Sequence, residues 1–82
     1  MDQTEIFEKV IKILTPYVKN QEALAKVTSA THILDDLKVN SARLVDVVLE
    51  FEDVFEIEID DDDVDTVETV GNAVGLIESK LG

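Results

Sequence analysis

The 82-residue sequence contains no cysteine, a single proline and only three glycines. Without cysteine the chain can form no disulfide, and it offers neither a thiolate metal ligand nor a thiol nucleophile. No apolar run approaches the roughly 20 residues that a membrane-spanning helix needs. The N-terminal residues also lack the basic segment and the apolar stretch of a signal peptide. We therefore expect a soluble, cytoplasmic protein that does not insert into a membrane.

Basic residues are scarce as well. Seven Lys and Arg face nineteen Asp and Glu, which gives a net charge of −12. Such a chain repels nucleic acid and anionic membranes, so neither is an expected partner. Every charged side chain from Asp46 to Glu68 is acidic, and a segment of this kind attracts proteins with basic patches, although it also aids solubility by itself. The large net charge further favours a monomer.

The residues of a catalytic site are not apparent. His32 is the only histidine, so a serine–histidine–aspartate triad would have to combine it with Ser29, Ser41 or Ser79, and no spacing supports this arrangement. No glycine-rich loop is present that could bind phosphate. We therefore predict that the protein is not an enzyme.

The aspartates at 60–63 and Asp65 suggest a calcium loop at first sight. An EF-hand loop needs a glycine at its sixth position and a glutamate at its twelfth. Counted from Asp60, these positions hold Asp65 and Gly71. We therefore expect no dedicated metal site, and a calcium-responsive module is only a weak alternative.

Apolar periodicity predicts a single all-α domain over residues 1–82. Apolar side chains recur at helical spacing in three longer segments, at about 4–19, 40–55 and 69–80. Pro16 should end or kink the first helix near Leu14. Residues 61–66, four of which are aspartates, favour one short helix. A long connection follows the first helix, and its residues 21–27 could form one or two further turns.

The same periodicity predicts which side chains are buried. The second long helix and the last helix should each bury one face. The connection before the second long helix and the one after it should insert isoleucine or leucine side chains into the core. The predicted core residues in these segments are Ile33, Leu34, Leu37, Leu44, Val47, Val48, Phe51, Val54, Phe55, Ile57, Ile59, Val70, Ala73, Val74, Ile77 and Leu81. Ala42, Val45 and Leu49 form a third stripe on the second long helix, which is more apolar than a solvated flank needs to be.

Ser41 stands at the start of that second helix. Its hydroxyl could cap the helix by accepting a hydrogen bond from a free amide, and Asn40 beside it could do the same. A serine at a helix start is also well placed for modification, because a phosphate on it would lie near free amides and the positive end of the helix dipole. The residues alone leave both interpretations open.

From residue 36 onward the chain resembles the acyl carrier proteins. The resemblance depends on an ordered set of features: an acidic residue and leucine in DDL before the serine, the serine opening a helix, then LVDVVLEFEDVFEIEID, an acidic short helix, and a final helix that begins TVGNAV. It implies a small acyl-carrier bundle in which Ser41 carries 4′-phosphopantetheine, attached by a phosphopantetheinyl transferase. The arm ends in a thiol that holds acyl groups as thioesters.

The resemblance also implies roles for neighbouring residues. Basic patches on the transferase and on acyl-transferring or acyl-modifying enzymes would dock on a face formed by Asn40, Ala42, Arg43, Val45, Asp46, Leu49 and Glu50. A cavity for the acyl chain would be lined by Leu44, Val48 and Ile59.

The chain departs from the family pattern at the modification site. The family reads D-S-L where this chain reads N-S-A, and Arg43 occupies a position that is usually acidic in the family. These departures point to a specialised carrier, in a lipid or secondary-metabolite pathway, with dedicated partners. They also leave an alternative, an unmodified acidic helical adaptor that binds basic proteins.

Overall fold

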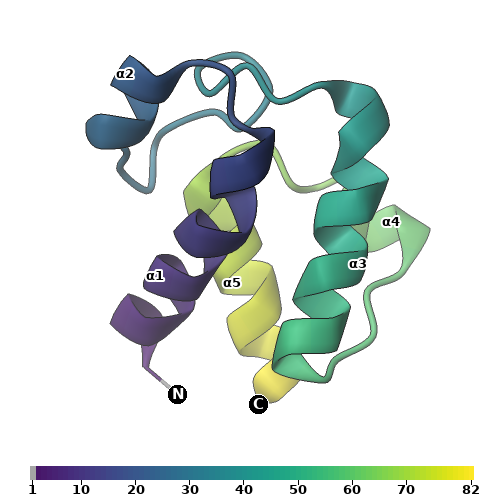
Figure 1. The fold of residues 1–82 in the computed structure, drawn as a ribbon. Helices are drawn as coiled ribbons and strands as arrows, with labels where there is room; N and C mark the ends of the chain where they lie inside the picture. Colours follow the sequence, from purple (N-terminus) through teal and green to yellow (C-terminus); the bar gives the residue numbers. More distant parts are fainter. Residues whose placement is uncertain (1) are drawn as a thin grey trace.

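The computed structural model describes residues 2–82, and its architecture is the predicted helical bundle. Three helices of twelve residues each form the body: α1 (Gln3–Leu14), α3 (Leu44–Phe55) and α5 (Val70–Leu81). Shorter helices are α2 (Gln21–Ala25) and α4 (Asp61–Val64), and the 3-10 turns are η1 (Thr15–Tyr17) and η2 (Ser41–Arg43). Figure 1 shows α2 and the long connection at one end of the bundle, with both chain termini at the other end.

Local sequence explains where each long helix begins and ends. The Asp2 carboxylate accepts a hydrogen bond from the Glu5 amide and caps α1, while Pro16 lies within the 3-10 turn that follows Leu14. Thr69 caps α5 in a reciprocal arrangement with Asn72. The predicted end of the first helix is therefore confirmed.

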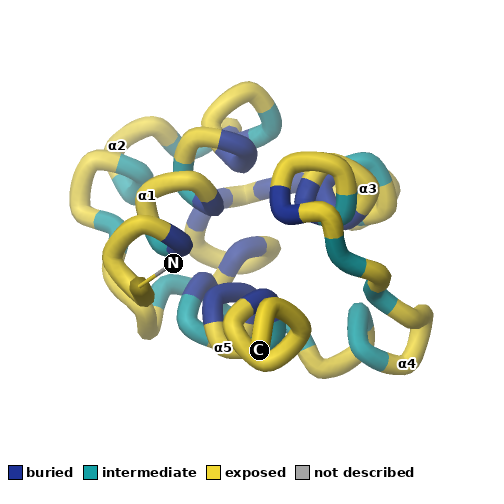
Figure 2. Tube along the Cα trace, turned by 90° about the horizontal axis from the view of Figure 1, so that it is seen from below, coloured by how far each residue is buried: buried dark blue, intermediate teal, exposed yellow. Residues whose placement is uncertain are grey.

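The core lies where α1, α3 and α5 face one another, closed at one end by the long connection. Figure 2 shows the buried parts of the three helices turned inward. Within residues 2–82 the buried apolar side chains are Ile6, Val10, Ile13, Leu14, Val18, Ile33, Leu37, Val39, Val47, Val48, Phe51, Phe55, Val70, Ala73, Val74 and Ile77.

Three leucine and valine side chains that we predicted to be buried are instead exposed. Leu34 lies on the outside of a tight turn in which the Asp36 amide bonds the His32 carbonyl. Val54 lies at the margin of the contact that Phe51 and Phe55 make in the last turns of α3. Leu81 is the last residue of α5, where few neighbours remain to cover it.

The connection between α3 and α4 is extended, as predicted, but its side chains are less buried than expected. Ile57 and Ile59 are half-buried against the edge of the core. The Ile59 amide donates a 3.0 Å hydrogen bond to the Glu52 carboxylate, which holds the connection against α3.

The long connection between α2 and η2 is fixed to the start of α5 by backbone hydrogen bonds. The Ile33 amide donates to Glu68, and the amides of Val70 and Gly71 donate to Thr31 and Ser29, with N···O distances of 2.9–3.0 Å. His32 and Thr69 form an isolated antiparallel bridge. The residues that lead to Ser41 are therefore positioned by a segment almost forty residues further along the chain.

Candidate functional site

Ser41 is exposed and is the first residue of η2, directly before α3. The helix cap is Asn40, whose Oδ1 accepts a 2.9 Å hydrogen bond from the Ala42 amide. The Asn40 carbonyl also accepts a 2.8 Å bond from the Arg43 amide. The Ser41 hydroxyl makes no hydrogen bond within residues 2–82. The interpretation of Ser41 as the cap is therefore wrong, and its hydroxyl is available for chemistry.

The segment before Ser41 holds this serine at the end of the bundle. The Leu37 carbonyl accepts hydrogen bonds from the amides of Lys19 and Asn20, both at 3.2 Å. Leu37 and Val39 are buried, so the backbone is anchored just before Asn40 reaches the surface. An exposed serine on an anchored backbone can be reached by a second protein without unfolding of its surroundings.

The outward face of α3 combines exposed apolar and acidic side chains. Val45 is 62 % exposed and Leu49 is 56 % exposed, which is unusual for large aliphatic side chains one helical turn apart. Asp46 is half-buried and Glu50 is exposed on the same helix. The structure thus brings together the residues for which the sequence predicted a docking role, with Asn40, Ala42 and Arg43 at the end nearest Ser41.

Two polar contacts fix side chains on this face. Arg43 Nη1 lies 3.3 Å from Asp46 Oδ2. The Tyr17 hydroxyl, from the turn that follows α1, donates a 2.7 Å hydrogen bond to Glu50 Oε1. This hydrogen bond raises the pKa of Tyr17, and burial and the negative charge of Glu50 add to the effect. Sequence reasoning missed the part played by Tyr17, because 33 residues separate the partners and no local pattern pairs them.

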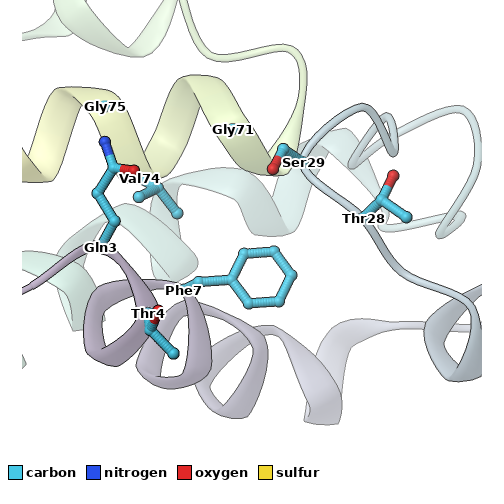
Figure 3. A pocket seen from close by; sticks show the side chains of 8 residues that line it. All are labelled: Gln3, Thr4, Phe7, Thr28, Ser29, Gly71, Val74 and Gly75. Atoms are coloured by element: carbon cyan, nitrogen blue, oxygen red, sulfur yellow. The ribbon is translucent and has the colours of Figure 1, made fainter.

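Of the three side chains predicted to line an acyl cavity, Leu44 and Val48 lie on α3 and Ile59 lies on the connection that follows it. Val48 is buried, whereas Leu44 and Ile59 are half-buried. A pocket of about 530 Å³ lies elsewhere, between α1, α5 and the loop at Thr28 and Ser29. Figure 3 shows Phe7 reaching from α1 toward that loop, with Gly71 and Gly75 on the α5 wall opposite.

The acidic segment around α4 contains one paired carboxylate. Asp63 Oδ2 lies 2.9 Å from Lys80 Nζ and also accepts a hydrogen bond from the Asp60 amide. These two bonds, the one from Lys80 first, lower the pKa of Asp63, and the same ion pair raises the pKa of Lys80. Asp63 thereby joins α4 to the last turn of α5. Within residues 2–82 no cluster of three or more His, Asp or Glu side chains has the arrangement of a metal site.

Comparison with known proteins gives consistent matches. Residues 5–77 match the family described as the phosphopantetheine attachment site. The acyl carrier protein of Thermotoga maritima is 41 % identical over 95 % of this chain and 94 % of its own length. The acyl carrier protein of Phenylobacterium zucineum is 37 % identical over 96 % of this chain and 98 % of its own length. A solved structure of acyl carrier protein from Enterococcus faecalis superposes with a TM-score of 0.80 at 39 % identity, covering 98 % of this chain and 99 % of that one.

None of the helices within residues 2–82 has both the length and the apolar character needed to cross a lipid bilayer.

Proposed function

Since the chain belongs to the acyl carrier protein family, whose members are non-enzymatic carriers of acyl groups on 4′-phosphopantetheine, we propose that Ser41 is the residue that bears this arm. The observation that carries the proposal is the free, exposed hydroxyl of Ser41 beside a helix cap supplied by Asn40. The bound arm supplies a terminal thiol, which a chain without cysteine otherwise lacks. Family membership argues against the unmodified adaptor.

The outward face of α3 is the proposed docking surface for the phosphopantetheinyl transferase and for acyl-handling enzymes. Support comes from the exposed aliphatic side chains of Val45 and Leu49, with Ala42 nearer Ser41. Asp46 and Glu50 flank this apolar stripe with negative charge. Basic patches on a partner would be steered by these carboxylates, and the aliphatic side chains would supply the apolar area buried on contact.

We propose further that Leu44, Val48 and Ile59 border the space that receives an acyl chain. Leu44 follows η2 directly, and Val48 lies one helical turn further from Ser41 on α3. A chain entering at Leu44 would pass Val48 and displace the half-buried Ile59 on the following connection. The N-S-A sequence and Arg43 support a specialised pathway with dedicated partners, and the net charge of −12 supports a monomeric single domain.

Intact-protein mass spectrometry tests the assignment of Ser41. The purified chain is incubated with coenzyme A and a broad-specificity phosphopantetheinyl transferase, and the expected result is a gain of one phosphopantetheine that peptide mapping assigns to Ser41. The Ser41→Ala variant should show no gain. Ser79→Ala is the matched control, because the Ser79 hydroxyl is exposed on α5 but bonds the Leu76 carbonyl, and this variant should load normally.

Two results would contradict the assignment. Loading of Ser41→Ala to the wild-type extent would place the arm on another residue. The other contradicting result is a chain that no transferase of the same cell loads, although its circular dichroism shows a folded helical protein. This chain would then not carry phosphopantetheine.

A further inference from the structure

Arg43 is the one basic residue between Lys38 and Lys80, and it lies two positions after Ser41. Its guanidinium is 3.3 Å from the Asp46 carboxylate, but the two side chains are 65 % and 47 % exposed. An ion pair this open to water is weak and readily exchanged for a better partner. Arg43 is therefore a cation in an otherwise acidic segment that its contact with Asp46 holds only weakly, and it can bind a second anionic group.

The backbone amides next to Ser41 are already occupied. Those of Ala42 and Arg43 bond the side chain and the carbonyl of Asn40, and that of Leu44 bonds the Ser41 carbonyl. The phosphate that attaches an arm to Ser41 Oγ would thus find the first amides of the helix engaged. The amides that follow Ser41 are thus not free to hold the phosphate, contrary to the expectation, and the Arg43 guanidinium is the charged donor that follows Ser41 in the chain.

The geometry of η2 places Arg43 within reach. A 3-10 helix rises about 2.0 Å per residue, so two residues are offset by only about 4 Å along its axis. The exposed side chain of Arg43 is longer than this offset and free to change rotamer. Guanidinium binds phosphate oxygens through two parallel hydrogen bonds, which makes phosphate a stronger partner than a singly contacted, solvated carboxylate.

We propose that Arg43 pairs with the phosphodiester once Ser41 is modified, and that this exchange releases the Asp46 carboxylate to the docking face. The inference rests on the proposed attachment at Ser41. Arg43 orients the base of the arm, and the modified protein presents an unpaired Asp46 to basic partners where the unmodified protein presents one in contact with Arg43.

The experiment uses the loaded protein, and intact mass first establishes that loading at Ser41 is complete. The ³¹P resonance of the phosphodiester is then compared in wild type, Arg43→Gln and Lys38→Gln. Lys38 is the matched control, because it is the cation on the other side of Ser41 and forms no ion pair within residues 2–82. We expect Arg43→Gln to shift the resonance and Lys38→Gln to leave it in place.

Salt dependence gives a second reading of the same contact. The difference between wild type and Arg43→Gln should be largest at about 0.01 M salt and should shrink toward about 1 M, where the Debye length has fallen from about 30 Å to about 3 Å. An identical ³¹P resonance in fully loaded wild type and Arg43→Gln would overturn the inference and leave the Ser41 assignment intact. A shift caused by Lys38→Gln instead would also overturn it.

The exchange itself is tested with ¹⁵N-labelled protein and Asp46→Asn. In the unmodified protein this substitution should move the Arg43 Nε resonance, because it removes the observed partner. In the loaded protein the resonance should be insensitive to Asp46→Asn. Equal sensitivity in the two forms would mean that Arg43 stays on Asp46 and that no carboxylate is released.

Discussion

The Tyr17 hydroxyl donates a 2.7 Å hydrogen bond to the Glu50 carboxylate and so joins the turn after α1 to the outward face of α3. Glu50 is one of the acidic side chains proposed to dock partners, and its carboxylate is held by a residue from another helix. The proposed docking face is therefore partly defined by η1, although all the residues predicted for it lie between Asn40 and Glu50.

This hydrogen bond predicts a distinctive alkaline titration. It raises the pKa of Tyr17 above its ordinary value of 10.0, so its contribution to the free energy of unfolding is complete below pH 10.0 and is lost as the pH rises through the folded pKa. Tyr17 is the only tyrosine, so phenolate absorbance reports it alone. We expect a midpoint above 10.0 in wild type and a lower one in Glu50→Gln. Equal midpoints would contradict the hydrogen bond.

The Asp63–Lys80 pair predicts an acid-dependent stability. The pair lowers the pKa of Asp63 below its ordinary 3.8, so its contribution is present above pH 3.8 and is lost as the pH falls through the lowered value. Asp63→Asn should therefore lower the melting temperature at pH 7, with a difference from wild type that disappears in acid. Asp62→Asn is the control on the same helix. Because Asp62 is exposed and forms no ion pair within residues 2–82, its loss should leave the melting temperature unchanged or raise it.

The two glycines of α5 predict opposite effects of the same substitution. A Cβ at Gly71 would lie 2.9 Å from the Ser29 carbonyl oxygen, whereas one at Gly75 would meet nothing within 4 Å. Gly71→Ala should cost about 1–3 kcal/mol, because the backbone of the long connection must move. Gly75→Ala should gain up to about 1 kcal/mol from the better helix propensity of alanine. Urea denaturation of the two variants measures both effects, and a Gly71→Ala variant as stable as wild type would contradict the close approach at Ser29.

The identity of the helix cap predicts that Asn40 and Ser41 differ in their effect on stability. Asn40→Ala removes the side chain that bonds the Ala42 amide and should cost about 1 kcal/mol. Ser41→Ala should change the free energy of unfolding by less than about 0.5 kcal/mol, since it removes no hydrogen bond within residues 2–82. Chemical denaturation distinguishes the two, and a larger loss in Ser41→Ala would show that the serine is the cap.

The helices were predictable from the sequence because their information is local. Spacing of apolar side chains located α1, α3 and α5, and Pro16 marked the end of α1 because its backbone has no amide donor. The choice between Asn40 and Ser41 as the cap was not predictable, because both side chains can accept the same hydrogen bond and only the backbone geometry decides between them.

The remaining features depend on segments that are distant in the sequence. Leu34 and Val54 have the residue type of core positions, but their exposure is set by a turn and by the extent of a neighbouring contact. The Tyr17–Glu50 bond and the pairing of residues 29–33 with residues 68–71 join parts of the chain whose proximity no local pattern encodes. The predicted docking residues lie close together in the sequence, so helical spacing was enough to group them. Tyr17 lies outside this segment, and its contact with Glu50 was therefore missed.

The backbone pairing between the long connection and the start of α5 has a consequence for the order of events during synthesis. The amides of Val70 and Gly71 and the carbonyl of Glu68 complete the support of the segment that leads to Ser41. A nascent chain that ends before these residues cannot close that contact. The surroundings of Ser41 thus take their final form only after the beginning of the last helix has emerged from the ribosome. If Ser41 bears the arm as proposed, a transferase that binds the folded surface would therefore meet it late in translation or after release.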